Sequence, residues 1–209
     1  MRFLLVDDHA VVRAGVRLIL AAAYPAATFG EAGTVSQAVD LLSSAPWDVV
    51  ITDITMPGRS GLDLLKTIKV VRPRLPVLVL SVHAEDQFAI RVIKAGAAGY
   101  LNKDSAPDEL VGAVKKVMAG HKYISGTLAE TLAADLLNQS DGAPHTQLSD
   151  REYEVFRLLA AGKTVKEIAF ELVLSVKTIS TYRTRILTKL NRHNNADLMR
   201  YAVQHGLLD

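Results

Sequence analysis

Apolar residues follow two alternating patterns over the first 120 positions of the chain. Short continuous apolar runs, rich in β-branched residues, alternate with longer segments in which apolar residues recur every three or four positions. The runs predict five strands, at residues 3–6, 28–30, 49–52, 77–80 and 99–101. The longer segments predict five helices, at residues 11–22, 35–43, 62–70, 88–95 and 108–118. Strands that alternate with helices favour right-handed crossovers, so we expect an α/β domain with a doubly wound, five-stranded parallel sheet.

The pattern becomes helical after residue 120. One helix is predicted over residues 128–139, and residues 140–144 (SDGAP) have the composition of a turn or linker. The last 63 residues predict four helices, which begin after the capping residues Ser149, Thr164 and Ser175 and near Asn195. We therefore divide the chain into an α/β domain (1–119), a linker with one helix (120–146) and an all-α four-helix domain (147–209).

The overall composition restricts the class of protein. Of the 209 residues, 49% are hydrophobic and 22% are charged, as in folded globular proteins. The chain contains no cysteine, which excludes disulfides, thiol catalysis and zinc sites built from cysteine. The longest uncharged stretch, residues 18–30, is broken by Pro25 and is shorter than the ~20 apolar residues that cross a bilayer. We expect a soluble cytoplasmic protein without a membrane partner.

Charge is unevenly distributed along the chain. The formal net charge of +2 combines +1 for residues 1–119, −2 for 120–146 and +3 for 147–209. Residues 176–192 contain five basic side chains and no acidic one. A local excess of this kind indicates a polyanionic partner, although a solvated helix face is an equally simple explanation at this point.

Charged and hydroxyl side chains follow several of the predicted strands. Asp7 and Asp8 follow the first strand, Asp53 the third and Ser81 the fourth, and Lys103 lies two residues beyond the fifth. Because the carboxyl ends of parallel strands converge at one edge of a sheet, we expect these side chains to meet there. Three carboxylates at one point need a cation such as Mg²⁺, and the lysine indicates a further anion. A carboxylate nucleophile, a metal ion and an ammonium group together suit phosphoryl transfer.

These residues resemble the receiver domain of bacterial two-component response regulators, a flavodoxin-like fold, over residues 1–119. The resemblance is carried by Asp7-Asp8, Asp53-Ile54-Thr55-Met56-Pro57-Gly58, Ser81 and the segment 95–103 (AGAAGYLNK). It implies that Asp53 accepts a phosphoryl group from a sensor histidine kinase. It also implies that Asp7, Asp8 and Asp53 hold Mg²⁺.

The resemblance assigns roles to three further residues. Lys103 contacts the phosphoryl group, and Ser81 and Tyr100 form a switch pair. Two positions depart from or vary within the family pattern. Asp104 follows the lysine where many receivers have proline, and Thr55 occupies a variable position two residues after the acceptor.

The predicted helix over residues 176–190 has two distinct faces. Five apolar positions should pack inward: Val176, Ile179, Tyr182, Ile186 and Leu190. The opposite face and its flanks carry hydroxyl groups and long cations: Lys177, Ser180, Thr181, Arg183, Thr184, Arg185 and Thr188. Small hydroxyl residues allow close approach to base edges, while long cations reach phosphates. The short preceding helix and the tight turn between them indicate a helix-turn-helix that inserts its second helix in the major groove.

Residues 148–208 resemble the LuxR-type four-helix DNA-binding domain, so the whole chain resembles a response regulator of the NarL/FixJ class. The matching segments are 148–152 (LSDRE), 167–169 (EIA), 174–175 (LS), 178–179 (TI) and 189–190 (KL). The usual Thr-Val-Lys-x-His pattern appears as Thr-Ile-Ser-Thr-Tyr at 178–182, which weakens any transfer of base preference. The resemblance implies a transcription regulator, not an enzyme, that dimerises when phosphorylated and binds double-stranded promoter DNA, with RNA polymerase as a further partner.

The same class dimerises through its fourth helix. We therefore expect Asp197, Leu198 and Tyr201 at the dimer interface, although packing of Leu198 within one subunit is equally consistent with the pattern.

Two other functions are considered. A haloacid-dehalogenase-like phosphatase also uses an Asp at the end of a strand with Mg²⁺, but it needs a second Asp two residues later, where this chain has Thr55. A DNA-binding sensor of a small diffusible ligand would need a sizeable apolar pocket, which the charged edge of the sheet disfavours.

Overall fold

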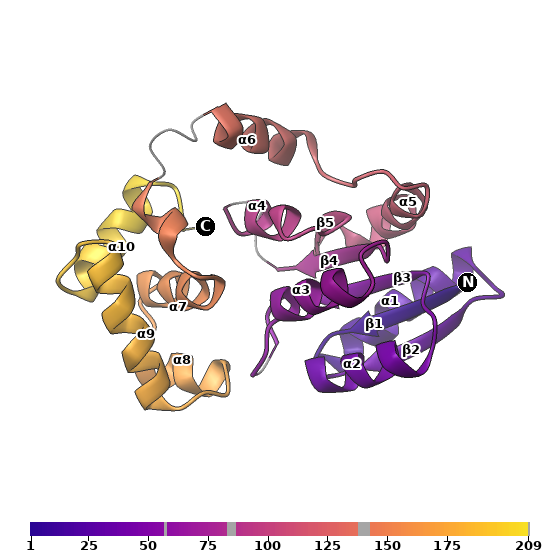
Figure 1. Ribbon diagram of the computed structural model, residues 1–209, viewed down its shortest axis with the longest axis horizontal. Coiled ribbons are helices and arrows are strands. Elements are labelled where there is room, and N and C mark those ends of the chain that lie inside the picture. The colour runs from indigo at the N-terminus through magenta and orange to yellow at the C-terminus, as the bar shows by residue number, and fades with distance from the viewer. Residues whose placement is uncertain (57, 83–86, 138–142, 209) are drawn as a thin grey trace. The chain divides into compact units, whose positions relative to one another are not determined.

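The structure is a computed structural model that describes residues 1–56, 58–82, 87–137 and 143–208. The chain divides into two compact units, residues 1–130 and 131–209, and the division falls within a helix (Figure 1). No helix in the described part of the chain is long and apolar enough to span a bilayer.

The first unit contains the predicted parallel sheet. Its strands lie in the order β2-β1-β3-β4-β5, and every neighbouring pair is parallel. The strands are β1 (Arg2–Val6), β2 (Thr28–Ala32), β3 (Val49–Asp53), β4 (Val77–Ser81) and β5 (Gly99–Asn102). The expected α/β fold is confirmed, and each strand is one or two residues longer than the apolar pattern predicts.

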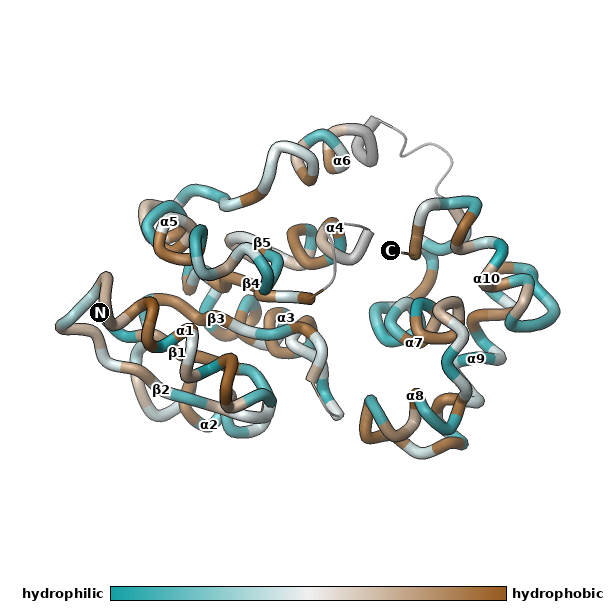
Figure 2. The backbone as a smooth tube through the Cα atoms, turned by 180° about the vertical axis from the view of Figure 1, so that it is seen from behind, coloured by the Kyte–Doolittle hydropathy of each residue, from teal (hydrophilic) through white to brown (hydrophobic). Residues whose placement is uncertain are grey.

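Five helices connect and follow these strands. They are α1 (Ala10–Ala23), α2 (Val35–Ser44), α3 (Gly61–Val71), α4 (Gln87–Lys94) and α5 (Ala106–Met118). Helices α1 and α5 pack together, and their apolar residues share one core with alternate residues of the strands. The intervening strand residues are buried on the opposite face, so all five residues of β3 and of β4 are buried. Figure 2 shows hydrophobic segments in both the strands and the helices of this unit. Burial on both faces explains why these strands are continuous apolar runs.

Polar residues fix the ends of the helices. In α3, the Ser60 side chain accepts a hydrogen bond from the backbone N–H of Asp63, and the Asp63 carboxylate accepts one from the N–H of Ser60. Gly61, the first residue of α3, packs directly on the end of β3, where an added Cβ would lie 1.9 Å from the carbonyl oxygen of Asp53. Only glycine permits this approach, so it holds the start of α3 against the end of β3.

The rest of the chain is helical. It contains α6 (Gly126–Leu137), a 3₁₀ turn η1 (Pro144–Gln147), α7 (Asp150–Ala160), α8 (Val165–Glu171), α9 (Val176–Lys189) and α10 (Asn195–Gln204). The predicted caps Ser149, Thr164 and Ser175 each accept a hydrogen bond from the backbone N–H three residues later. Residues 138 and 139 of the predicted helix and residues 140–142 of the predicted linker lie outside the described residues.

The second unit is built around α7. Helix α7 packs against both α9 and α10, and α8 packs against α9. Two of the five predicted inward residues of α9, Ile179 and Ile186, are fully buried within the helix, and Leu190 is buried just after it. Val176 was expected to point inward but is 48% exposed, and Tyr182 is only half-buried. Val176 is the first residue of α9, where side chains lean back beyond the helix end, so it does not reach the core.

Candidate functional site

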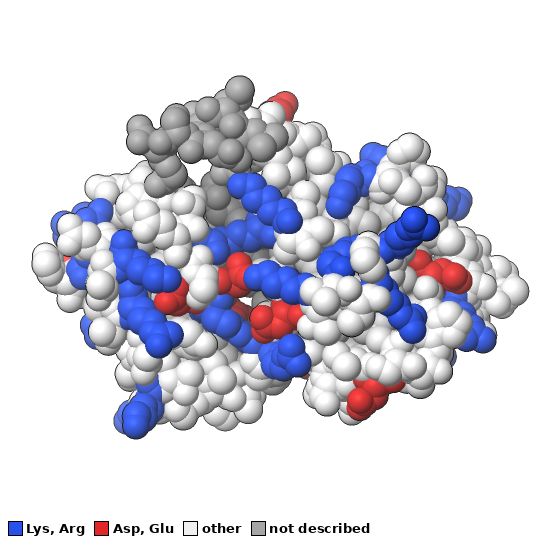
Figure 3. Space-filling model, viewed as in Figure 1, with Lys and Arg blue, Asp and Glu red and all other residues white. Residues whose placement is uncertain are grey.

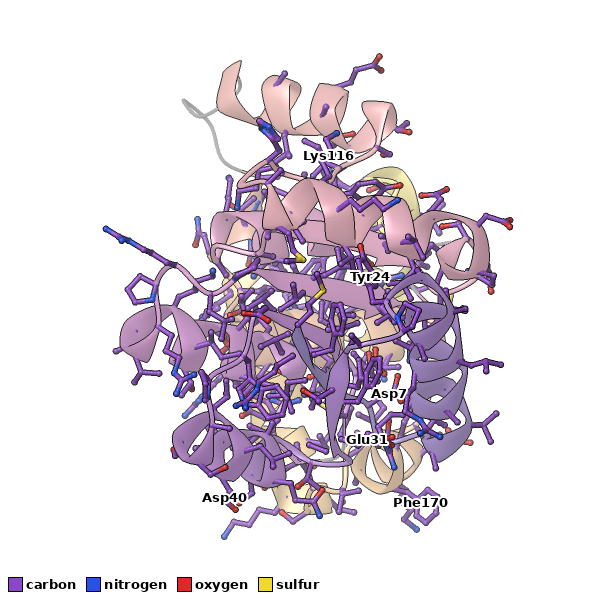
Figure 4. All side chains as sticks on the ribbon, turned by 90° about the vertical axis from the view of Figure 1, so that its right-hand side faces the viewer. Asp7, Tyr24, Glu31, Asp40, Lys116 and Phe170 are labelled. Carbon is purple, nitrogen blue, oxygen red and sulfur yellow. The ribbon has the colours of Figure 1, made fainter. Side chains whose placement is uncertain are left out.

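The carboxyl ends of the strands place three ionised groups in direct contact. Lys103 follows β5, and its Nζ lies 2.7 Å from Oδ2 of Asp7 and 2.8 Å from Oδ2 of Asp53. Asp7, labelled in Figure 4, directly follows β1, and Asp53 ends β3. The side chains of Asp7 and Asp53 are only 6% and 5% exposed, so the three charges are largely removed from water. The attraction between Lys103 and each of the two carboxylates is therefore weakly screened.

Hydrogen bonds hold the Asp53 carboxylate in one orientation. Its Oδ1 accepts a hydrogen bond of 2.7 Å from the backbone N–H of Ile54, while its Oδ2 faces Lys103. The carbonyl oxygen of Ile54 in turn accepts a bond of 2.9 Å from the N–H of Gly61. The start of α3 therefore supports the loop that directly follows Asp53. Pro57, part of the same motif, lies outside the described residues.

Burial and ion pairing act in opposite directions on the pKa values at this site. Burial raises the pKa of Asp53 above its ordinary value, and the neighbouring Lys103 offsets only part of this increase. Burial alone would lower the pKa of Lys103, but its hydrogen bonds to Asp53 and Asp7 outweigh burial and raise that pKa. Lys103 is therefore a fixed positive charge at neutral pH.

Asp8 completes a cluster of metal-ligating groups. Asp7, Asp8, His9 and Asp53 each offer one ligand atom, and these atoms lie within 4.8 Å of one another. The buried Oδ1 of Asp8 accepts no hydrogen bond, although His9 Nδ1 lies 2.9 Å away. A buried carboxylate oxygen without a donor is suited to a cation. Because Mg²⁺ prefers oxygen ligands, the three carboxylates fit this ion better than the imidazole of His9 does.

His9 was not among the residues expected at the site. It precedes α1, and its backbone N–H donates a hydrogen bond of 2.8 Å to Oδ1 of Asp7. Its ring is 66% exposed and contacts both Asp7 and Asp8. Its position next to the aspartate pair is the only signal in the sequence that would have identified it.

Ser81 and Tyr100 lie on the neighbouring strands β4 and β5. Ser81 ends β4, and its carbonyl oxygen accepts a hydrogen bond of 2.8 Å from the backbone N–H of Lys103. Tyr100 pairs with Val79 in the sheet. Both Ser81 and Tyr100 are fully buried, so the tyrosine ring already occupies an interior position in this structure.

The second candidate site is the outer face of α9. Six of the seven residues expected there are exposed: Lys177, Ser180, Thr181, Thr184, Arg185 and Thr188. Arg183 differs, because it is half-buried and its Nε donates a hydrogen bond of 2.6 Å to Oδ1 of Asn195 on α10. On the face drawn in Figure 3, Lys and Arg are the prevalent charged side chains over this unit, at the left of the picture. The structure thus presents one exposed helix face that combines hydroxyl groups and cations.

Both parts of the chain match known families. Residues 3–115 match the response regulator receiver domain, and residues 146–202 match the bacterial regulatory proteins of the luxR family. The chain belongs to the response regulators. It combines a receiver domain with a LuxR-type DNA-binding domain, as in the NarL/FixJ class.

Individual relatives resemble this response regulator over nearly its whole length. The response regulator UvrY of Escherichia coli K12 is 38% identical over 205 residues, which cover 98% of this chain and 94% of UvrY. The response regulator GacA of Pseudomonas aeruginosa is 36% identical over 210 residues, covering 100% and 98% of the two chains. Among solved structures, RcsB of Salmonella enterica serovar Typhimurium bound to the promoter rprA with a phosphomimetic is 31% identical, with a TM-score of 0.63 and coverage of 96% and 98%. UvrY and GacA are response regulators, and RcsB is bound to promoter DNA in its solved structure.

The response regulator buries two of the three residues expected at a dimer interface. Leu198 is fully buried and Tyr201 is 2% exposed, while Asp197 is half-buried. The Tyr201 hydroxyl lies 3.0 Å from Nδ1 of the buried His145 in η1. The side chains of Leu198 and Tyr201 therefore belong to the core of their own domain, and a role of Asp197, Leu198 and Tyr201 at a dimer interface stays a prediction.

The exposed apolar residues of α10 are different ones. Met199 is 42% exposed and Val203 is 66% exposed, on the side of the helix away from the core. A single apolar period along a helix does not say which of its apolar residues face the core and which stay exposed.

Proposed function

We propose that this response regulator accepts a phosphoryl group on Asp53 from a sensor histidine kinase and then binds promoter DNA as a dimer. The observation that carries the proposal is the contact of Lys103 with both Asp7 and Asp53 at the carboxyl edge of the sheet. A buried carboxylate with a fixed ammonium group beside it combines a nucleophile with a partner for a phosphoryl oxygen. We place this activity in the cytoplasm, where bacterial DNA is found.

The transfer uses few groups of this chain. An Asp53 oxygen attacks the phosphorus of the kinase phosphohistidine, the P–N bond breaks, and the imidazole leaves with its electron pair. The Nζ of Lys103 is close enough to pair with an oxygen of the transferred group. Asp7, Asp8 and Asp53 would hold Mg²⁺, which supplies positive charge against the phosphoryl oxygens. The orphan Oδ1 of Asp8 supports this ligand set. Each chain keeps its phosphoryl group, so we class the protein as a regulator and not as an enzyme.

Phosphorylation of Asp53 would act first on buried side chains of the neighbouring strands. A phosphoryl group adds roughly −1.5 to −2 charges and three acceptor oxygens next to β4 and β5. We propose that Ser81 and Tyr100 respond to this charge and that residues 120–146 serve as the linker to the LuxR-type domain. Lys177, Ser180, Thr181, Thr184, Arg185 and Thr188 then contact double-stranded DNA. Arg183 helps to position this face by its hydrogen bond to Asn195 on α10. RNA polymerase is the final partner at the promoter.

Phosphate incorporation tests the first step. The full-length protein is incubated with acetyl phosphate, with and without Mg²⁺, and its intact mass is recorded. We expect one phosphoryl group on the wild type in the presence of Mg²⁺ and none on Asp53→Asn. Asp40→Asn is a matched control, because Asp40 is an exposed residue of α2 that lies well away from Asp7 in Figure 4. Normal phosphorylation of Asp53→Asn would refute the assignment of the acceptor.

A further inference from the structure

Four hydroxyl groups on the exposed face of α9 are already hydrogen-bonded within the helix. We call these residues, Ser180, Thr181, Thr184 and Thr188, the hydroxyl face. Each side-chain oxygen donates to the carbonyl oxygen four residues earlier: Ser180 to Val176 at 2.8 Å, Thr181 to Lys177 at 3.0 Å, Thr184 to Ser180 at 3.1 Å and Thr188 to Thr184 at 3.0 Å. The hydroxyl face therefore repeats the same hydrogen bond, from a side-chain hydroxyl to the carbonyl oxygen one turn earlier.

This state limits what the hydroxyl face can offer to a ligand. A hydroxyl group has a single proton and two lone pairs, and here the proton is used inside the helix. The oxygen is left as a hydrogen-bond acceptor. Each threonine adds a methyl group to the exposed surface. The four residues therefore present acceptors and methyl groups, and they present no free donor without breaking a bond in the helix.

The edges of base pairs in the major groove differ in how they match such a surface. Adenine N6 and cytosine N4 are the donors there. Each pair also presents two acceptors, adenine N7 and thymine O4 or guanine N7 and O6, and only thymine presents a methyl group. An A·T pair thus offers both a donor and a methyl group. A G·C pair offers the same number of donors and acceptors but no methyl group, so the preference for A·T rests on the contact between threonine and thymine methyl groups.

The long donors of α9 lie at the borders of the hydroxyl face. Lys177 occupies the first turn, at its N-terminal end, and Arg185 is exposed on its flank. Arg183, on the other flank, is bonded to Asn195. No arginine, asparagine or glutamine, the usual partners of guanine and adenine edges, is among the four residues of the face.

We propose that the hydroxyl face selects A·T base pairs, with its oxygens accepting from adenine N6 and its threonine methyl groups packing on thymine methyl groups. The inference rests on the proposed DNA contact of α9 and specifies the bases that this contact recognises. The selected positions are the base pairs that face Ser180, Thr181 and Thr184, beyond the end of the helix that Lys177 occupies.

Selection of binding sites from a random duplex pool is the first test. The full-length protein, treated with acetyl phosphate and Mg²⁺, is used for selection, and the retained duplexes are sequenced. We expect repeated half-sites with A·T pairs at adjacent positions, where a change to G·C lowers affinity roughly tenfold or more. Half-sites with a required guanine at those positions would overturn the inference but leave the proposed function intact. Failure to retain any duplex would overturn both.

Base analogues test the two contacts separately on a selected site. Replacing thymine by uracil removes one methyl group, and replacing adenine by purine removes the 6-amino group. We expect the uracil change to weaken wild-type binding roughly fourfold, the effect of one buried methyl group. Hypoxanthine in place of a guanine leaves the major-groove edge unchanged and is the DNA control.

Substitutions at two exposed positions assign these effects to the helix. Thr181→Ser and Thr184→Ser keep the oxygen but lose the methyl group, so the sensitivity to uracil at the facing base pair should disappear. Thr181→Val and Thr184→Val keep a methyl group but lose the oxygen, so sensitivity to uracil should remain and sensitivity to purine should disappear. Thr67→Ser is the matched control, because Thr67 on α3 makes the same bond, of 2.8 Å, to the carbonyl oxygen of Asp63. Unchanged sensitivity to uracil in both serine variants would overturn the inference.

Discussion

The backbone N–H of Tyr100 donates a hydrogen bond of 3.1 Å to the carbonyl oxygen of Tyr123, and the N–H of Tyr123 donates one of 2.9 Å to Ala98. The segment that follows α5 therefore pairs with the outer edge of β5. The Tyr123 hydroxyl also donates a bond of 2.6 Å to Glu109, and Lys116 lies 5.6 Å from the centre of the Tyr123 ring. The start of the expected linker is thus hydrogen-bonded to β5, the strand that carries Tyr100, the proposed switch residue.

Gly99 should be required for this pairing. A Cβ at Gly99 would lie 2.7 Å from the carbonyl oxygen of Tyr123 and 2.8 Å from Cδ1 of Leu78. We expect Gly99→Ala to lower the free energy of unfolding by about 1–3 kcal/mol, because the added methyl group overpacks a closed space. Urea denaturation of the full-length protein measures this change.

Gly112→Ala is the control for that experiment. Gly112 lies within α5, and a Cβ there would meet no atom within 4 Å. The substitution should stabilise the protein by up to about 1 kcal/mol, because alanine favours the helix more than glycine does. If Gly99→Ala and Gly112→Ala changed the free energy of unfolding equally, the space between position 99 and Tyr123 would not be tightly packed.

Leu198 should contribute to stability and Met199 should not. Leu198 is fully buried under α7, whereas its neighbour Met199 is 42% exposed. We expect Leu198→Ala to cost about 2–5 kcal/mol in unfolding free energy and Met199→Ala to cost less than about 0.5 kcal/mol. Denaturation curves and sedimentation of the phosphorylated protein are compared. A stable Leu198→Ala variant that fails to dimerise would instead support an interface role for Leu198.

Glu152 gives the LuxR-type domain a pH-dependent contribution to stability. Its Oε2 accepts hydrogen bonds of 2.6 Å from Lys189 and 2.8 Å from the N–H of Ser149. Burial acts to raise the pKa of Glu152, but these bonds outweigh burial and hold that pKa below its ordinary value. The carboxylate therefore stabilises the folded state above the ordinary pKa of glutamate, and this contribution is lost as the pH falls through the lowered folded-state pKa.

Comparison with Glu152→Gln isolates that contribution. At pH 7 the variant should be less stable by about 1–3 kcal/mol, since it loses a hydrogen bond between charged groups. The difference from the wild type should shrink as the pH falls below about 4. Glu130→Gln, at an exposed position of α6, is the control. A difference that stays constant between pH 7 and pH 3 would contradict the assigned pKa direction.

Local patterns predicted the elements of the structure well. Continuous apolar runs located the five strands because a sheet buried on both faces leaves no polar alternation. Ser149, Thr164 and Ser175 located three helix starts because a capping hydroxyl acts on a backbone N–H only three residues away. The meeting of Asp7, Asp53 and Lys103 followed from strand order alone, since parallel strands bring their carboxyl ends to one edge.

Tertiary contacts without a local signal were not predicted. The pairing of Tyr123 with β5 involves one residue of an irregular segment, where no period exists to detect. The burial of Leu198 and Tyr201 depends on which side of α10 meets α7, and the hydrogen bond from Arg183 to Asn195 joins two separate helices. Each of these contacts depends on how the elements pack, which no local pattern in the sequence encodes.

Arg183 and Arg185 should differ in their effect on DNA binding, although they are two residues apart on α9. Arg185 is exposed, whereas Arg183 is half-buried and bonded to Asn195. If Arg185 contacts a phosphate, Arg185→Ala should weaken binding to all duplexes alike and reduce the slope of log Kd against log salt by about one unit. Arg183→Ala should leave more of the salt slope intact and instead lower the unfolding free energy by about 1–3 kcal/mol, because a part-buried charged hydrogen bond is lost. Fluorescence anisotropy at several salt concentrations measures the salt slope, and urea denaturation measures the stability. If Arg183→Ala reduced the slope and Arg185→Ala reduced the stability, Arg183 would be the phosphate contact.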